Sequence, residues 1–210
     1  DRRKFLKHSS LVALGGLTTT GLMGAATLPA SIPSISPENM NIIGPREGYS
    51  PHIGTLVSMM NWMREVMLMP VQGMSISDLD YLIDDNANTI GAMLMHLAAT
   101  ERFYQINTFD NKKWGDFPEE DLMKFGAASS LGDRGRAEIK GKPLDYYLEE
   151  MSTIRENTLS EFKKRDDNWL FSVDNDFPWG PTNNYCKWFH VCEHESNHNG
   201  VFKFLKSRIS

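Results

Sequence analysis

The chain is poor in cysteine, with 2 in 210 residues, Cys186 and Cys192. These residues are six positions apart on one predicted helix, which places their Cα atoms about 9 Å apart, beyond disulfide reach. Their spacing also differs from the Cys-x-x-Cys pattern of thiol redox motifs. We therefore expect two free thiols, with neither a disulfide nor a thiol redox centre.

Clusters of lysine and arginine are missing after Lys7. When Asp1, Arg2, Arg3, Lys4 and Lys7 are set aside with the first thirty residues, 18 basic and 26 acidic residues remain, a net charge of −8. Nucleic-acid binding needs clustered positive charge to displace counterions from phosphates. The composition therefore excludes nucleic acid as a partner.

Residues 1–30 differ in composition from the rest of the chain. Residues 1–7, Asp-Arg-Arg-Lys-Phe-Leu-Lys, resemble a twin-arginine export motif, and the weakly apolar stretch after them has no charged residue before Glu38. The alternative, a transmembrane helix, is disfavoured by the glycines, the threonines and Pro29. We expect an export signal over 1–30 that the export machinery recognises, a linker over 31–49, a folded domain over 50–210, and a periplasmic or otherwise exported location.

Sustained strand alternation is absent too. Apolar residues recur at helical spacing instead, in four segments: 52–69, 88–107, 144–164 and 183–208. Pro51 and Pro143 are typical of helix starts, and Pro70 and Gly73 end the first segment. The sequence predicts an all-α protein, an up-down four-helix bundle with long connecting loops.

Three shorter stretches connect these helices. Residues 77–80 open a short acidic turn or helix, and the glycine-rich residues 110–142 predict a long irregular connection with room for one short helix. Residues 168–184 predict an aromatic loop before the last helix. We expect the aromatic loop to lie near any site that the last helix forms.

Histidine occurs in a pattern that indicates metal binding. His194 and His198, within His-Glu-Ser-Asn-His, lie one helical turn apart, so that two imidazoles can converge on one divalent ion. Helical periodicity places both on the apolar, core-facing side of the last helix together with Val201, and Asn199 on the opposite face. His190 continues the row, but three such rings span about 12 Å, so only an adjacent pair should bind one ion. The alternative is core histidines that hydrogen-bond carbonyl groups.

Two segments resemble the DinB-like superfamily of metal-binding four-helix bundles: residues 95–101, Met-His-Leu-Ala-Ala-Thr-Glu, and residues 194–200, His-Glu-Ser-Asn-His-Asn-Gly. The resemblance covers residues 50–209. It implies one ligand from the second helix and two from the last, hence His96, His194 and His198. Many members have Arg-Gly-Gln where this chain has Asn-Gly-Val at 199–201, which removes two side chains that could bind a substrate.

A site with three histidine ligands keeps one coordination position open, as catalytic zinc sites do. Zinc fits best, and nickel, iron or manganese also fit because imidazole discriminates weakly among them. Such an ion lowers the pKa of water and polarises a carbonyl or captures a thiolate. Characterised members of the superfamily include thiol-dependent transferases and isomerases, a chemistry of the cytoplasm rather than of an exported protein.

The resulting hypothesis is an exported metal-dependent hydrolase or transferase that acts on a small-molecule substrate. Glu195 and Glu101 are the candidate general bases. As alternatives, Glu195 is a solvated carboxylate at the helix edge, and Glu101 pairs with Arg102 or with a neighbouring helix. The loop aromatics, namely Trp169, Phe171 and Trp179, are more typical of core or lid packing than of substrate contact.

Two other functions stay open. His-Glu-Ser-Asn-His also matches the His-Glu-x-x-His motif of zinc peptidases, with Glu195 as base, but no third ligand follows His198. The second is a non-enzymatic interaction module in which the ion stabilises the fold. A homodimer is compatible with each of these functions.

Overall fold

The computed structural model describes residues 40–209. The predicted export signal and residues 31–39 of the predicted linker lie outside this range. Within it, the chain is mostly α-helical and has almost no strand, so the all-α prediction is confirmed. No helix of these residues is long and apolar enough to cross a membrane.

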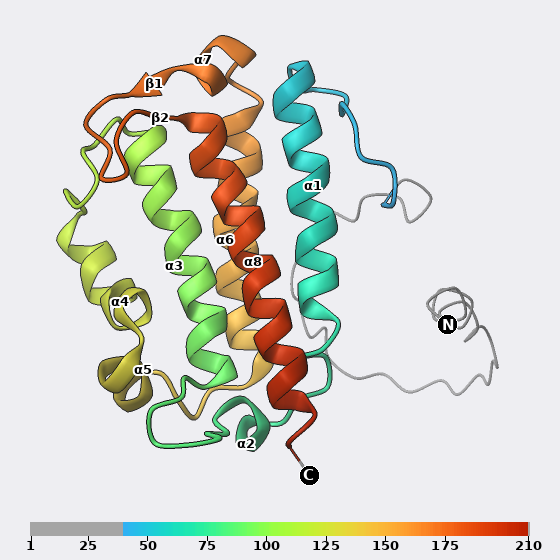
Figure 1. Cartoon of the computed structure of the whole chain (residues 1–210), viewed down its shortest axis with the longest axis vertical. Coiled ribbons are helices and arrows are strands. Elements are labelled where there is room, and N and C mark those ends of the chain that lie inside the picture. The colour runs from blue at the N-terminus through green and yellow to red at the C-terminus, as the bar shows by residue number, and fades with distance from the viewer. Residues whose placement is uncertain (1–39, 210) are drawn as a thin grey trace, which may run out of the picture. The chain divides into compact units, whose positions relative to one another are not determined.

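The described residues form eight helices and one small hairpin (Figure 1). The helices are α1 (Pro51–Leu68), α2 (Ile76–Leu79), α3 (Ile90–Thr108), α4 (Glu119–Ser130), α5 (Gly132–Glu138), α6 (Leu144–Phe162), α7 (Asp167–Phe171) and α8 (Asn184–Lys206). The strands β1 (Val173–Asp174) and β2 (Thr182–Asn183) pair antiparallel, with Val173 opposite Asn183.

The four longest helices, α1, α3, α6 and α8, lie side by side (Figure 1). Helix α8 packs against α1 and α3, and α3 packs against α6 and α4. Helix α3 is apolar almost all round because it has neighbours on nearly every side, and nearly all of its residues are buried. The four segments with helical periodicity are therefore the four long helices, with ends within a few residues of those predicted.

Side-chain caps fix where two of the long helices, α3 and α8, begin. Thr89 Oγ1 accepts a hydrogen bond from the Ala92 N–H at 3.1 Å, and Asn183 Oδ1 accepts one from the Cys186 N–H at 2.8 Å. Each cap satisfies a backbone donor that the first helical turn leaves free. The cap on α8 sets the register of this helix and thereby the direction of its histidine row.

The glycine-rich connection is more regular than the sequence predicted. Residues 110–142 contain both α4 and α5. Three acidic residues in the first turn of α4 stabilise its N-terminus, and Phe125 buries its ring against the core. Leu131, which has positive φ, separates the two helices, and Gly132, also with positive φ, is the first residue of α5. The sequence predicted an irregular connection with room for one short helix, whereas the structure has two helices there, because two of the glycines lie inside helices rather than in turns.

The core has two apolar clusters with a charged layer between them. One cluster includes Met67 and Phe202, and the other includes Met60 and Val191. Along α1, Arg64 lies between members of the two clusters, and Glu195 occupies the same place on α8. Glu101 on α3 and Arg155 on α6 complete the layer, so each long helix contributes one buried charge.

Candidate metal centre

The structure brings His96 of α3 together with His194 and His198 of α8. One nitrogen from each ring lies within 4.8 Å of the other two. His96 Nε2 and His194 Nε2 are 2.8 Å apart. The ring centroids form a triangle with sides of 4.9, 5.4 and 4.8 Å. Zinc–nitrogen bonds of about 2.0–2.1 Å place tetrahedral ligands about 3.3 Å apart, so small side-chain movements would close this triangle around an ion.

Helix α4 orients His96. His96 Nδ1 is 2.9 Å from the carbonyl oxygen of Ala128, one of the carbonyl groups that the last turn of α4 leaves without a helical partner. A carbonyl only accepts, so Nδ1 must be the protonated nitrogen and Nε2 bears the lone pair that faces His194. Histidine ligands in metal sites are usually fixed by such a hydrogen bond to their second nitrogen.

All three rings are kept neutral. Burial is the main cause, and it lowers the pKa of His194 to about 3 and that of His198 to about 4, with the neighbouring imidazoles adding to the effect. Burial also lowers the pKa of His96, although its hydrogen bond to Ala128 opposes this. Only the neutral imidazole has a lone pair to donate, so the rings are in the ligating form at neutral pH.

His198 provides the clearest sign that the cluster fits an ion. Its Nδ1 is buried and has no hydrogen-bond partner among the described residues. A buried polar atom without a partner costs free energy, and native structures rarely leave one. Three neutral imidazoles with facing nitrogens therefore match the donor set of a divalent transition metal, although they do not select zinc over nickel, iron or manganese.

The next histidine in the row, His190, faces a different environment. Its Nδ1 is 2.9 Å from the hydroxyl of Tyr104, and the ring of Trp179 meets it edge-on at 5.0 Å. His190 also belongs to a second group of candidate ligands, with Glu193 and His194, whose ligand atoms lie within 4.8 Å of one another. His52 lies apart from both groups and pairs with Asp167 at 2.9 Å.

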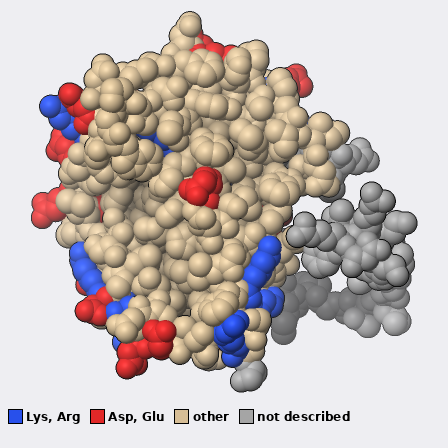
Figure 2. Space-filling model, in the orientation of Figure 1, with Lys and Arg blue, Asp and Glu red and all other residues tan. Residues whose placement is uncertain are grey.

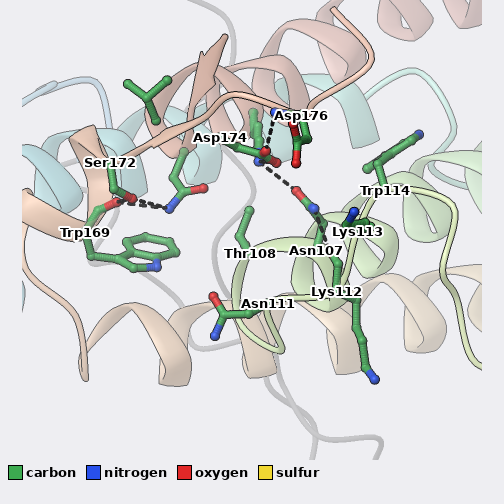
Figure 3. A pocket seen from close by; sticks show the side chains of 13 residues that line it. Asn107, Thr108, Asn111, Lys112, Lys113, Trp114, Trp169, Ser172, Asp174 and Asp176 are labelled. Atoms are coloured by element: carbon green, nitrogen blue, oxygen red, sulfur yellow. Dashed lines mark hydrogen bonds and ion pairs between the residues drawn. The ribbon is translucent and has the colours of Figure 1, made fainter. Parts of the chain in front are cut away.

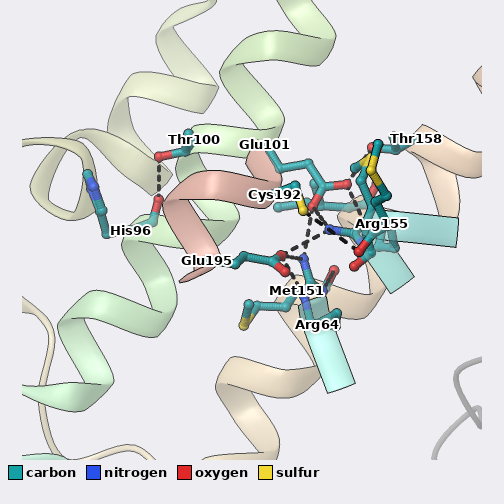
Figure 4. A network of polar contacts seen from close by, with 12 residues as sticks. Arg64, His96, Thr100, Glu101, Met151, Arg155, Thr158, Cys192 and Glu195 are labelled. Atoms are coloured by element: carbon teal, nitrogen blue, oxygen red, sulfur yellow. Dashed lines mark hydrogen bonds and ion pairs between the residues drawn. The ribbon is translucent and has the colours of Figure 1, made fainter. Parts of the chain in front are cut away.

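The two candidate bases, Glu101 and Glu195, lie in the buried charged layer (Figure 4). Arg155 Nε and Nη2 donate to Glu101 at 2.7 and 3.0 Å, and Arg155 Nη2 also donates to Glu195 at 3.0 Å. Arg64 bridges the same two carboxylates at 2.9 and 2.7 Å. Burial opposes ionisation of Glu101, but the two arginines and Thr158 hold its pKa below the ordinary value. Both carboxylates are thus paired, and neither belongs to the two groups of candidate ligands.

This placement settles which alternatives apply to the two glutamates. Glu195 is 1% exposed, so the expectation of a solvated carboxylate at the helix edge was wrong. Glu101 pairs with neighbouring helices rather than with Arg102, whose guanidinium binds Asp121 instead. In Figure 4, Glu195 points with Arg64 and Arg155 into the layer, while His96 lies to one side.

Sequence analysis missed Arg64 and Arg155. A signal was present, because each arginine occupies a position on the apolar stripe of its own helix, next to Met63 and Ile154 respectively. A charged residue at such a position requires a buried partner of opposite charge. Two arginines and two glutamates on four apolar stripes therefore predict an internal ion network.

The buried face of α8 is also rotated from the one predicted. Asn199, expected on the opposite face, is 7% exposed, whereas Val201, expected in the core, is 40% exposed. The buried stripe contains Glu195 and Asn199, and the three histidines lie half-buried along its edge toward α3. The error arose because periodicity was assigned from apolar residues alone, and this stripe includes polar ones.

Of the three loop aromatics, only Trp179 reaches the histidine row. Trp169 stacks on Phe109 at 5.7 Å and belongs to the core, and Phe171 packs edge-on against His52 at 5.1 Å. The packing interpretation therefore holds for Trp169. Trp179 is more than half exposed and borders the site beside His190.

A pocket of about 420 Å³ lies at the end of the long helices that carries the hairpin (Figure 3). Its lining includes Asn107, Asp174 and Lys187, and no histidine. The buried Lys187 ammonium donates to Asn107 Oδ1 at 2.9 Å and to Asp174 Oδ2 at 2.8 Å. These bonds attach the hairpin to the C-terminal end of α3 and the first turns of α8, a structural role separate from the histidine cluster.

Cys186 and Cys192 are free thiols, as predicted. Burial raises the pKa of Cys192 to about 11, so its sulfur stays protonated and ligates poorly at neutral pH.

The comparisons with known proteins name no family for this arrangement: no protein-family model matches the chain, and no curated protein matches it in sequence.

Proposed function

We propose that this chain is an exported DinB-like protein, an up-down four-helix bundle that binds one divalent metal ion through His96, His194 and His198. The observation behind the proposal is the convergence of three neutral imidazoles from α3 and α8, with ring nitrogens within 4.8 Å of one another. Zinc is the first candidate, because three imidazoles with one open position are typical of catalytic zinc.

The proposed activity is hydrolysis or group transfer on a small-molecule substrate. A divalent ion in the cluster would supply Lewis acidity toward a carbonyl or a thiol. Ala128 holds the His96 ring in place, and His190 and Trp179 border the cluster on the side of the aromatic loop. In this proposal, these last two side chains contact the substrate at the open coordination position.

The position of Glu195 argues against the zinc-peptidase alternative. A peptidase base must face the water on the metal, and both arginines of the charged layer bind the Glu195 carboxylate instead. The metal-stabilised module is disfavoured by the same layer. Four buried charges and two apolar clusters join the long helices without contribution from the histidines, so the fold does not need an ion.

Metal analysis tests this proposal directly. The protein should be produced without a histidine tag, stripped with a chelator and titrated with Zn²⁺. We expect one ion per chain in the unaltered protein and strong loss of affinity in His96→Ala, while circular dichroism shows unchanged helicity. The matched control is His52→Ala, which removes an exposed histidine that pairs with Asp167.

Two results would contradict the proposal. Full Zn²⁺ affinity in His96→Ala would exclude the three-histidine site. Loss of helicity on removal of the ion from the unaltered protein would favour the metal-stabilised module over an enzyme.

A further inference from the structure

His194 belongs to two groups of candidate ligands, and only the inner one, with His96 and His198, enters the proposed function. The outer group consists of His190, Glu193 and His194, within 4.8 Å of one another. All three are on α8, at spacings that place them on neighbouring positions of one helix surface. Two imidazoles and one carboxylate form a ligand set suited to a divalent transition metal. The order His-x-x-Glu-His also occurs on helices of zinc enzymes, where the two histidines are the ligands.

The outer side chains are held by partners outside the group. Tyr104 binds His190 Nδ1 at 2.9 Å, which leaves Nε2 free. In the same way, the carbonyl oxygen of Ala128 binds Nδ1 of the inner ligand His96 and leaves its Nε2 free. Asn197 Nδ2 donates to Glu193 Oε1, which leaves the second carboxylate oxygen available. Positioned ligands of this kind lose little conformational entropy when an ion binds.

The outer group lies closer to solvent than the inner one. Burial of the four rings decreases in the order His96, His198, His194, His190, and Glu193 is partly exposed. Figure 2 shows a broad, largely uncharged face with one acidic group near its centre. A partly exposed carboxylate such as Glu193 attracts cations from solution.

Simultaneous occupation of both groups is disfavoured by electrostatics. Two divalent ions bound at once, one in each group, would repel each other four times as strongly as two unit charges at the same separation. Glu193 supplies only one negative charge to offset this repulsion. One ion at a time avoids this repulsion. Because His194 is common to both groups, an ion can move between them without losing contact with the protein.

We propose that His190, Glu193 and His194 form an outer capture site, at which a divalent ion first binds before it passes to His96, His194 and His198. This proposal rests on the proposed function, because the inner group is the destination. It assigns to His190 and Glu193 a role in the rate of metal uptake rather than in final affinity.

Uptake kinetics test the proposal. The full chain, stripped of metal, is mixed rapidly with Zn²⁺ bound to a chromophoric chelator, and the transfer is followed in the unaltered protein, His190→Gln and Glu193→Gln. Glutamine at 190 can still hydrogen-bond Tyr104 but ligates poorly. We expect uptake to slow about tenfold in both variants, since loss of one ligand or supporting group typically lowers a metal site's affinity by about 10- to 100-fold. The final stoichiometry should stay at one ion per chain.

Two controls address general effects of charge and histidine loss. Glu149→Gln removes an exposed carboxylate from α6, and His52→Ala removes an exposed histidine from α1. Both should take up Zn²⁺ at the unaltered rate. Unchanged uptake in His190→Gln and Glu193→Gln would overturn the proposal, as would two ions per chain in the unaltered protein.

If the ion does not bind at the inner group, the variants give a different pattern of affinities. If His96→Ala keeps full affinity while His190→Gln loses it, the ion resides in the outer group, and the proposed function itself is overturned. Loss of affinity in His96→Ala with slowed uptake in His190→Gln supports both proposals together.

Discussion

Two polar clusters lie side by side on α3 and α8, one made of paired charges and the other of neutral rings. Glu101 and Glu195 face Arg64 and Arg155 in a dry layer where opposite charges balance. His96, His194 and His198 form a half-buried group of neutral rings, one of which has a nitrogen without a partner. The charges of the layer pair with one another within the protein, although Glu195 Oε2 has no hydrogen-bond partner among the described residues, whereas the histidine cluster has unused ligating capacity. The former supports the fold, and the latter is suited to a ligand.

The largest expected effect comes from unbalancing the charged layer. Arg155→Met should lower the free energy of unfolding by about 3–5 kcal/mol, because it leaves two buried carboxylates with one arginine. Urea unfolding followed by circular dichroism measures the loss. Arg134→Ala, which breaks the exposed pair with Glu138, should cost less than about 1 kcal/mol. Similar effects of the two substitutions would show that the layer is hydrated rather than dry.

The next effect concerns the histidine cluster and appears only with metal. At a Zn²⁺ concentration 100 times its dissociation constant, the unaltered protein should gain about 2.7 kcal/mol of stability. His194→Ala should abolish this gain and leave the helicity of the metal-free protein unchanged. Thermal unfolding with and without Zn²⁺ gives the comparison. A gain that persists in His194→Ala would mean that the ion binds elsewhere.

A smaller effect measures how strongly the charges in the layer depend on one another. Glu101→Gln in an Arg155→Met background removes one of the two carboxylates that would then share Arg64, and restores charge balance. The double variant should therefore lose less stability than the sum of the two single variants, with a coupling of about 1–3 kcal/mol. Simple additivity would show that the two residues act independently.

A separate effect, which needs acid pH to appear, is a dependence of stability on pH. His194 and His198, with pKa values lowered to about 3 and about 4, stay neutral in the folded protein at pH values where the unfolded chain, with ordinary values near 6.5, takes up protons. The unfolded state then binds more protons, so the stability of the metal-free protein should fall as the pH decreases from about 6.5 toward 4.

Between pH 6.5 and 5, the change in stability arises mainly from the histidines. The contribution of Glu101, whose pKa is lowered, is lost only below its ordinary value of 4.5. His198→Ala should flatten the slope in this interval, and Arg134→Ala should leave it unchanged. An identical slope in His198→Ala would contradict the assignment to the histidine cluster.

The sequence predicted the four long helices well, because caps and apolar periodicity are local signals. Thr89 and Asn183 are recognisable helix caps from the sequence alone. The approach of His96 to His194 came from resemblance rather than from periodicity, since residues 98 positions apart give no local signal. The contact of His96 with Ala128 was missed for the same reason. The charged layer had a local signal, two arginines on apolar stripes, but its pairing joins helices far apart in the chain.

The charged layer also bears on how the domain folds. Its four members come from positions 64, 101, 155 and 195, one on each long helix. An intermediate that lacks any one helix would bury an unequal number of positive and negative charges, which is costly in a nonpolar interior. The layer can therefore close only when α8, the last of the four in the chain, docks on the others. We expect α1, α3, α6 and α8 to fold and unfold as one cooperative unit.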